Sequence, residues 1–151
     1  MGRRQDIEAV IEDPQTDAAL RARLAQVLAI RDFASTALGL PENDSYRTFA
    51  DLERPYVVWN VVATPEFSLA PKRWCFLFVG CLAYKGWFSE EKARREAQRL
   101  RARGYDVAVG GVAAYSTLGR FADPFLNTMA GYSEPRVASL VFHELAHQQL
   151  Y

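Results

Sequence analysis

The sequence predicts an α+β fold, and three observations lead to that prediction. Segments with a helical apolar period come first, strand-like segments follow, and a helix, a further strand and a last helix complete the chain. This order is typical of domains in which helices and a sheet occupy different parts of the sequence. The chain has 151 residues, the length of one domain, and half of them are hydrophobic, enough for a packed core. We expect a helical arm over 1–16 and a single domain over 17–151.

The N-terminal part of the chain is predicted to be helical. A short helix over 5–12 ends before Pro14, and a long helix over 17–38 begins at Thr16 or Asp17. Both of these residues are good N-caps, because a side-chain oxygen can accept a hydrogen bond from a free amide of the first turn. Apolar residues recur along the long helix with a helical period, so one face of it is expected to pack on the core.

Strand-like segments fill the middle of the chain. After 39–55, which we expect to be an irregular but packed connector, residues 56–64 are β-branched or aromatic and are bounded by prolines. This pattern predicts a buried central strand. A second strand is expected over 74–82 and a third over 105–109, and the third can continue past a glycine pair into 112–115.

Two more helices are expected. One begins at Ser89 and ends at Gly104, with glutamates in its first turn and arginines in its last, as the helix dipole favours. We interpret its arginine-rich face as a solvated surface, because glutamates alternate with the arginines. The last helix begins at Ser133 and runs to Tyr151. Its second half is almost without charge, and we therefore expect this helix to be buried nearly all round.

Composition and charge exclude several classes of function. Lysine and arginine number 18, as do aspartate and glutamate, so the chain lacks the net positive charge with which proteins bind nucleic acids or anionic membranes. No apolar run approaches the roughly 18 residues of a transmembrane helix, and no signal peptide opens the sequence. We expect neither a nucleic-acid partner nor a membrane-spanning segment, and the sequence as it stands indicates the cytoplasm.

The two cysteines, Cys75 and Cys81, lie six residues apart, a spacing typical of neither a redox pair nor a zinc finger. We interpret them as buried apolar thiols. A disulfide across a tight loop is the second choice, in an oxidising compartment.

Both histidines of the chain lie in a His-Glu-x-x-His motif near the C-terminus. On a helix, His143 and His147 share one face and can present their ring nitrogens to one metal ion at the roughly 2.0 to 2.1 Å that zinc prefers. Glu144 projects beside that ion but outside its coordination shell, where a general base can take a proton from water. The motif predicts a zinc site, and a hydrogen-bonded histidine pair without metal is the alternative.

The helical period places this site on one face of the last helix. His143 and His147 lie opposite an apolar arc of about 180°. One face is therefore expected to pack on the core while the other faces a site. The apolar arc is formed by Val137, Ala138, Val141, Phe142, Leu145 and Ala146.

Several runs of sequence outside the generic metal motif are specific to one family. They are Leu38-Gly39-Leu40-Pro41, Ser45-Tyr46-Arg47, Ala50-Asp51-Leu52, Arg54-Pro55-Tyr56-Val57-Val58-Trp59-Asn60-Val61, Ala63-Thr64-Pro65-Glu66-Phe67-Ser68-Leu69, Trp74-Cys75-Phe76, Gly80-Cys81 and Ala114-Tyr115-Ser116-Thr117-Leu118-Gly119. On these runs and the motif, the chain resembles the bacterial putative aminopeptidases, which are zinc metallopeptidases of the gluzincin type. The resemblance covers roughly residues 17–151.

The resemblance implies a zincin-like fold, with helices packed on a small mixed or antiparallel sheet and the metal-motif helix at the C-terminal end. It implies that His143 and His147 are zinc ligands, that Glu144 is the catalytic base and that the substrate is a peptide. Family members take a third ligand from a glutamate in a downstream Asn-Glu-x-x-x-Ala segment, so we expect this sequence to be the N-terminal portion of a longer enzyme. The resemblance also implies the bacterial cell envelope or periplasm.

The segment after the third predicted strand is a candidate substrate site. Zincins commonly hold an extended substrate against an edge strand beside the metal helix. An ordinary strand and turn leading to the helix is the alternative interpretation. The candidate substrate-binding residues are Tyr115, Ser116, Thr117 and Gly119.

The third zinc ligand is missing from the motif itself. Asp123 is conceivable as a substitute, whereas Glu134 lies about 13 Å from His143 along the helix axis, too far to share the ion. Two histidines alone are expected to bind zinc weakly and exchangeably. The rival hypothesis is therefore a non-catalytic fragment or binding module that retains a vestigial metal motif.

Overall fold

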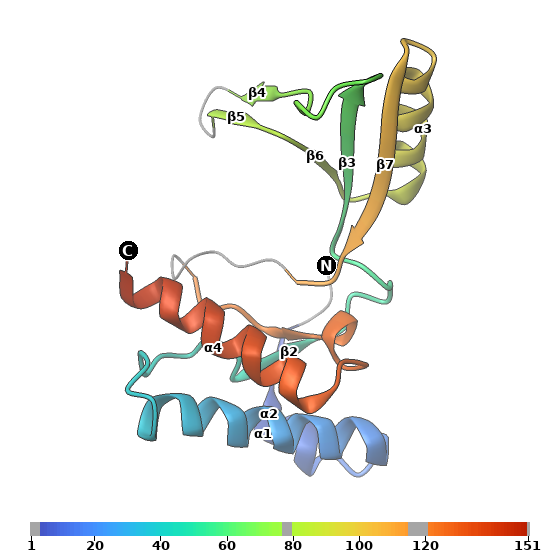
Figure 1. Cartoon of the computed structure of the whole chain (residues 1–151). Coiled ribbons are helices and arrows are strands. Elements are labelled where there is room, and N and C mark those ends of the chain that lie inside the picture. The colour runs from blue at the N-terminus through green and yellow to red at the C-terminus, as the bar shows by residue number, and fades with distance from the viewer. Residues whose placement is uncertain (1–3, 77–79, 115–120, 151) are drawn as a thin grey trace. The chain divides into compact units, whose positions relative to one another are not determined.

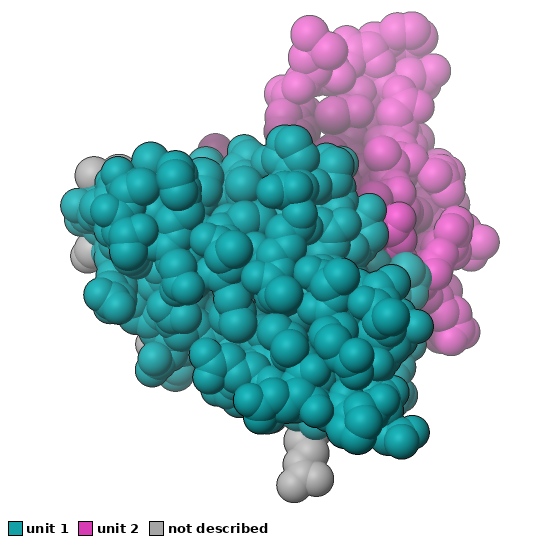
Figure 2. Space-filling model, turned by 90° about the horizontal axis from the view of Figure 1, so that it is seen from below, with its two compact units in different colours: residues 1–55, 114–151 teal, residues 56–113 magenta. Residues whose placement is uncertain are grey.

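The computed structural model describes residues 4–76, 80–114 and 121–150, and within them it contains four α-helices and three small sheets (Figure 1). The α+β fold class is thereby confirmed. The chain forms two compact units: unit 1 comprises Met1–Pro55 and Ala114–Tyr151, and unit 2 comprises Tyr56–Ala113 (Figure 2). The expected helical arm over 1–16 and single zincin-like domain over 17–151 stay a prediction.

Unit 1 contains three helices, α1 (Ile7–Glu12), α2 (Ala18–Thr36) and α4 (Glu134–Leu150). Asp17 caps α2, because its carboxylate accepts hydrogen bonds from the free amides of the first turn, at 2.9 and 3.2 Å. At the other end Gly39 adopts a φ of +65°, the left-handed conformation that ends many helices. The predicted start of the long helix is confirmed, and the helix ends at Thr36, two residues before the predicted end.

A small mixed sheet crosses unit 1. Its middle strand β2 (Thr48–Ala50) pairs antiparallel with β1 (Gln5–Asp6) and parallel with β8 (Phe125–Leu126). The first helix is therefore shorter than the predicted 5–12, and the predicted connector 39–55 contains a strand. Neither strand could be found locally, because each is too short to show a period and pairs with a distant segment.

The core of unit 1 lies between its helices and this sheet. The helices α2 and α4 pack on each other, and each contributes one stripe of fully buried apolar side chains. Burial of such side chains is worth about 1.5 to 3 kcal/mol each and is the main force that orients α4. The buried residues are Leu24, Val27 and Ala34 of α2, Phe125 of β8, and Val137, Val141 and Leu145 of α4.

Unit 2 is built on the predicted central strand. The strand β3 (Val58–Pro65) lies between β6 (Lys85–Trp87) and β7 (Tyr105–Val112), and it is antiparallel to both. The helix α3 (Glu90–Arg101) packs on this sheet, which confirms the predicted helix and its Ser89 N-cap. The core between them consists of Trp59, Val61, Ala63, Ala93, Ala97 and Leu100.

The predicted strand over 74–82 is wrong, because two strands, β4 (Trp74–Phe76) and β5 (Gly80–Leu82), form a hairpin there. Cys75 and Cys81 lie directly opposite each other and form a disulfide, with their Cα atoms 3.9 Å apart. Both residues are exposed, so the interpretation as buried thiols is also wrong. A continuous apolar run gives no sign that its two ends pair antiparallel, and the opposed position of the two cysteines depends on that pairing.

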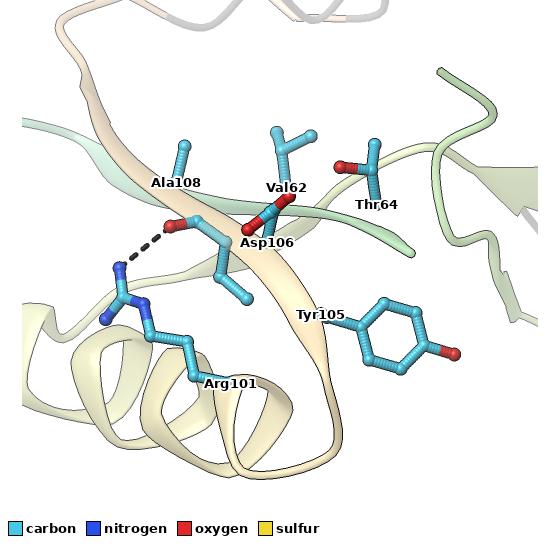
Figure 3. Close-up of a pocket in the computed structure, with 7 residues that line it drawn as sticks. Val62, Thr64, Arg101, Tyr105, Asp106 and Ala108 are labelled. Atoms are coloured by element: carbon cyan, nitrogen blue, oxygen red, sulfur yellow. Dashed lines mark hydrogen bonds between the residues drawn. The ribbon is translucent and has the colours of Figure 1, made fainter. Parts of the chain in front are cut away.

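The arginines of α3 are solvated, as predicted. Arg94 pairs with Glu90 at 2.6 Å, and both side chains are largely exposed. Figure 3 shows Arg101 reaching from α3 to β7, where its guanidinium donates to the Val107 carbonyl oxygen at 2.7 Å. This contact borders an open pocket of about 430 Å³ that is also lined by Val62, Thr64, Tyr105, Asp106 and Ala108.

All three tryptophans of the chain, Trp59, Trp74 and Trp87, lie in unit 2. Among the helices that the structure describes, none combines the length and the hydropathy needed to cross a bilayer.

Candidate metal centre

The helix α4 supports the candidate centre. The backbone amides of Arg136 and Val137 both donate to the Ser133 carbonyl oxygen, at 3.0 Å each, so the helix begins where the sequence predicted. It continues without interruption through the motif to Leu150. Residues three or four positions apart consequently share a face, and α4 presents three adjacent stripes with different surroundings.

The first stripe carries the two histidines. The Nε2 atoms of His143 and His147 are 3.0 Å apart, and the ring centroids are 4.5 Å apart with the rings nearly perpendicular. Two imidazole nitrogens that bind one tetrahedral zinc ion at about 2.05 Å are separated by roughly 3.3 Å. The 3.0 Å contact is also a hydrogen-bond distance between the two rings, which is the alternative that the sequence left open. The geometry fits a shared zinc ion with a small change in side-chain torsion, and neutral imidazole is a ligand type that zinc favours.

The expectation that α4 is buried nearly all round is wrong. The core stripe of Val137, Val141 and Leu145 is fully buried, but Ser139 and His143 on the opposite side are exposed. Absence of charge did not imply burial here, because small, amide and imidazole side chains tolerate solvent. His143 is accordingly exposed to solvent, and His147 is partly exposed.

The third stripe lies between the histidine stripe and the core stripe. It carries Glu144 and Gln148, which are four residues apart. Gln148 is bonded through both ends of its amide: Asn43 Nδ2 donates to its Oε1 at 2.7 Å, and its Nε2 donates to Ser45 Oγ at 3.3 Å. Glu144 is half-buried, and its negative charge raises the pKa of Tyr46, which follows Asn43 and Ser45 in the chain. This stripe therefore faces the loop 41–46.

Tyr46, at the end of this loop, interacts electrostatically with Glu144, the candidate base. Its side chain is buried, and its amide donates to the Asp123 carbonyl oxygen at 2.6 Å. Burial raises the pKa of the Tyr46 phenol, and the negative charges of Glu144 and Asp123 raise it further. The phenol consequently stays protonated and neutral beside Glu144 throughout the ordinary pH range.

Arg31 is a residue of this region that the sequence analysis missed. Its side chain is completely buried, and burial lowers its pKa. It donates to the carbonyl oxygens of Pro41, Asn43 and Ser45 at 2.8 to 3.0 Å. A signal was present, because an arginine stands at a position of α2 that otherwise continues the buried apolar stripe, and a cation there needs buried acceptors.

Neither Asp123 nor Glu134 joins the histidine pair. No group of three or more His, Cys, Asp or Glu side chains gathers anywhere in 4–76, 80–114 and 121–150. Asp123 is buried, and Glu134 lines a shallow pocket between α2 and α4 instead. The candidate substrate residues, Tyr115, Ser116, Thr117 and Gly119, lie outside the described residues.

The fold and this centre define a class of protein first: an α+β protein with a helix that presents two converging imidazoles beside a carboxylate. The family model described as Putative aminopeptidase matches residues 1–151, and the chain belongs to this family. The match confirms the family that the sequence resembled, and the family name indicates a peptidase-like function. Neither the curated proteins nor the solved structures provide a match.

Proposed function

We propose that this chain carries the zinc-binding part of a metallopeptidase of the aminopeptidase type, with His143 and His147 as zinc ligands and Glu144 as general base. The observation that supports it is the 3.0 Å separation of the two Nε2 atoms on an exposed stripe of α4, one residue from a carboxylate. Family membership supports a peptide substrate. The zincin-like description of the fold and the location in the cell envelope belong to the same proposal.

In this mechanism each side chain has one task. Zinc, when bound, supplies Lewis acidity toward water and toward the scissile carbonyl. Glu144 accepts a proton from the attacking water as the new C–O bond forms, and it returns that proton to the amine as the C–N bond breaks. Tyr46 remains a neutral phenol, so it does not compete with Glu144 for that proton.

Two histidines supply only part of a catalytic zinc site, which generally has three protein ligands. The pair alone would bind zinc exchangeably, and a third protein ligand would complete the site. The rival candidate, a non-catalytic module with a vestigial motif, is favoured by one observation: no third acidic, histidine or cysteine side chain joins the pair in the described parts of the chain.

Zinc content and hydrolysis of a peptide with a free N-terminus test the proposal together. Glu144→Gln should lower hydrolysis at least 100-fold, the usual contribution of a general base, while zinc binding is retained. Glu134→Gln, an exposed glutamate in the first turn of the same helix, is the matched control and should keep full activity. An N-acetylated peptide should be cleaved poorly if the enzyme is an aminopeptidase.

Hydrolysis that survives Glu144→Gln would remove the assigned base. A wild-type protein that binds no zinc, at any concentration that leaves it folded, would favour the non-catalytic module.

A further inference from the structure

The stripe of α4 that lies against loop 41–46 has a contact that the proposed reaction does not use. Gln148 directly follows His147, and its amide is held at both ends by Asn43 and Ser45. These bonds join residues more than 100 positions apart in the sequence. They therefore fix the last turns of α4 to the loop that follows α2.

The loop itself is held from behind by Arg31. Three of its carbonyl oxygens accept from Nε and Nη2 of this one buried guanidinium, and Nη1 donates to Ser35 Oγ. In addition, the Asn43 side chain accepts from the Ser45 amide at 3.0 Å. A guanidinium has a planar, rigid set of donors, so several acceptors bound to it have little freedom to move relative to one another.

The backbone at the end of the loop has one well-determined conformation. Tyr46 has a φ of +63°, which is unusual for a bulky residue. Such a conformation is strained and persists only where the surroundings determine it. Here they do, because the Tyr46 ring is buried and its amide is bonded to the segment at Asp123.

We propose that loop 41–46 is a positioning element of the zinc site: by holding Gln148, it keeps the His147 imidazole in place opposite His143. This inference rests on the proposed zinc site and assigns Asn43, Ser45 and Gln148 as positioning residues. The physical basis is the fraction of molecules whose two histidines are arranged to bind one ion. A metal binds only those conformers in which both Nε2 atoms converge, and the apparent dissociation constant rises as the populated fraction of such conformers falls.

The experiment measures zinc affinity by competition with a chromophoric chelator, so it does not depend on catalysis. Gln148→Ala removes both bonds to the loop and should weaken zinc binding about tenfold, at the lower end of the effect of outer hydrogen-bond partners on metal sites. Gln149→Ala is the matched control, because Gln149 is the next residue of the same helix and is exposed. Its zinc affinity should equal that of the wild type.

Two further variants separate positioning from a general loss of structure. Gln148→Glu keeps an acceptor for Asn43 and can accept from the Ser45 hydroxyl, so it should restore most of the affinity. Asn43→Ala and Gln148→Ala should be strongly non-additive, because each removes the same contact. Helical circular dichroism should be the same in all of these proteins.

The failures of the two proposals are distinguishable. If the wild type binds zinc and Gln148→Ala binds it equally well, the positioning role is overturned while the zinc site stands. Additive effects of Asn43→Ala and Gln148→Ala, or no recovery with Gln148→Glu, would overturn it as well. A wild type without zinc affinity overturns the proposed function itself, and the positioning role with it.

Discussion

Replacing Arg31 by leucine tests how much the buried guanidinium stabilises unit 1. The leucine side chain fills a similar apolar volume, but it leaves the carbonyl oxygens of Pro41, Asn43 and Ser45 without their donor. A hydrogen bond from a charged donor contributes about 1.5 kcal/mol at the lower end. Three such bonds give roughly 4.5 kcal/mol, of which the removal of a buried charge returns a part. We expect a net loss of about 3 kcal/mol.

The assay is urea unfolding followed by circular dichroism at 222 nm. Arg31→Leu should lower the free energy of unfolding by about 3 kcal/mol with an unchanged m value, and it should lower Tm by about 6 to 12 °C for a chain of this length. Arg47→Leu is the control, because Arg47 pairs with the exposed Asp32 at 2.9 Å and such a pair is worth less than about 1 kcal/mol. An Arg31→Leu loss no larger than that of Arg47→Leu would refute the reasoning.

Two more predictions concern single side chains. Because the folded state raises the pKa of Tyr46, unfolded chains lose this proton first as the pH passes about 10, and the free energy of unfolding should then fall by about 1.4 kcal/mol per pH unit. Tyr46→Phe should lack this component, and parallel urea-unfolding profiles of the two proteins from pH 8 to 11 would contradict the burial of the phenol. A Cβ at Gly111 would overlap the Tyr56 ring, which packs edge-on against Trp59, whereas a Cβ at Gly110 meets nothing. Gly111→Ala should therefore lower stability by about 1 to 3 kcal/mol relative to Gly110→Ala in thermal melts, and equal Tm values would show that the ring moves aside freely.

The sequence predicted those elements that depend on residues close together in the chain. Asp17 and Ser89 cap their helices as expected because capping depends on a few adjacent residues. The run between Pro55 and Pro65 predicted a strand because β-branched and aromatic residues favour strands, and this strand lies between two others. The helical spacing of the motif likewise sufficed to bring His143 and His147 together.

The parts that were missed depend on contacts between distant segments. The strand β2 exists only through partners near the chain start and far downstream. The disulfide depends on the antiparallel pairing of β4 with β5, which an apolar run does not mark. The loop 41–46 looks like an ordinary connector until Arg31 and Gln148 are seen to bind it from two sides. Long-range hydrogen bonds of this kind have no sequence period and cannot be read from one chain.

The confinement of all three tryptophans to unit 2 has a practical consequence. Selectively excited tryptophan fluorescence reports the indole environments of unit 2 alone, whereas the long helices α2 and α4 of unit 1 provide most of the helical dichroic signal. One denaturation recorded with both signals therefore follows the two units separately without any label. Superimposable curves are the signature of one cooperative domain, and displaced curves are the signature of two.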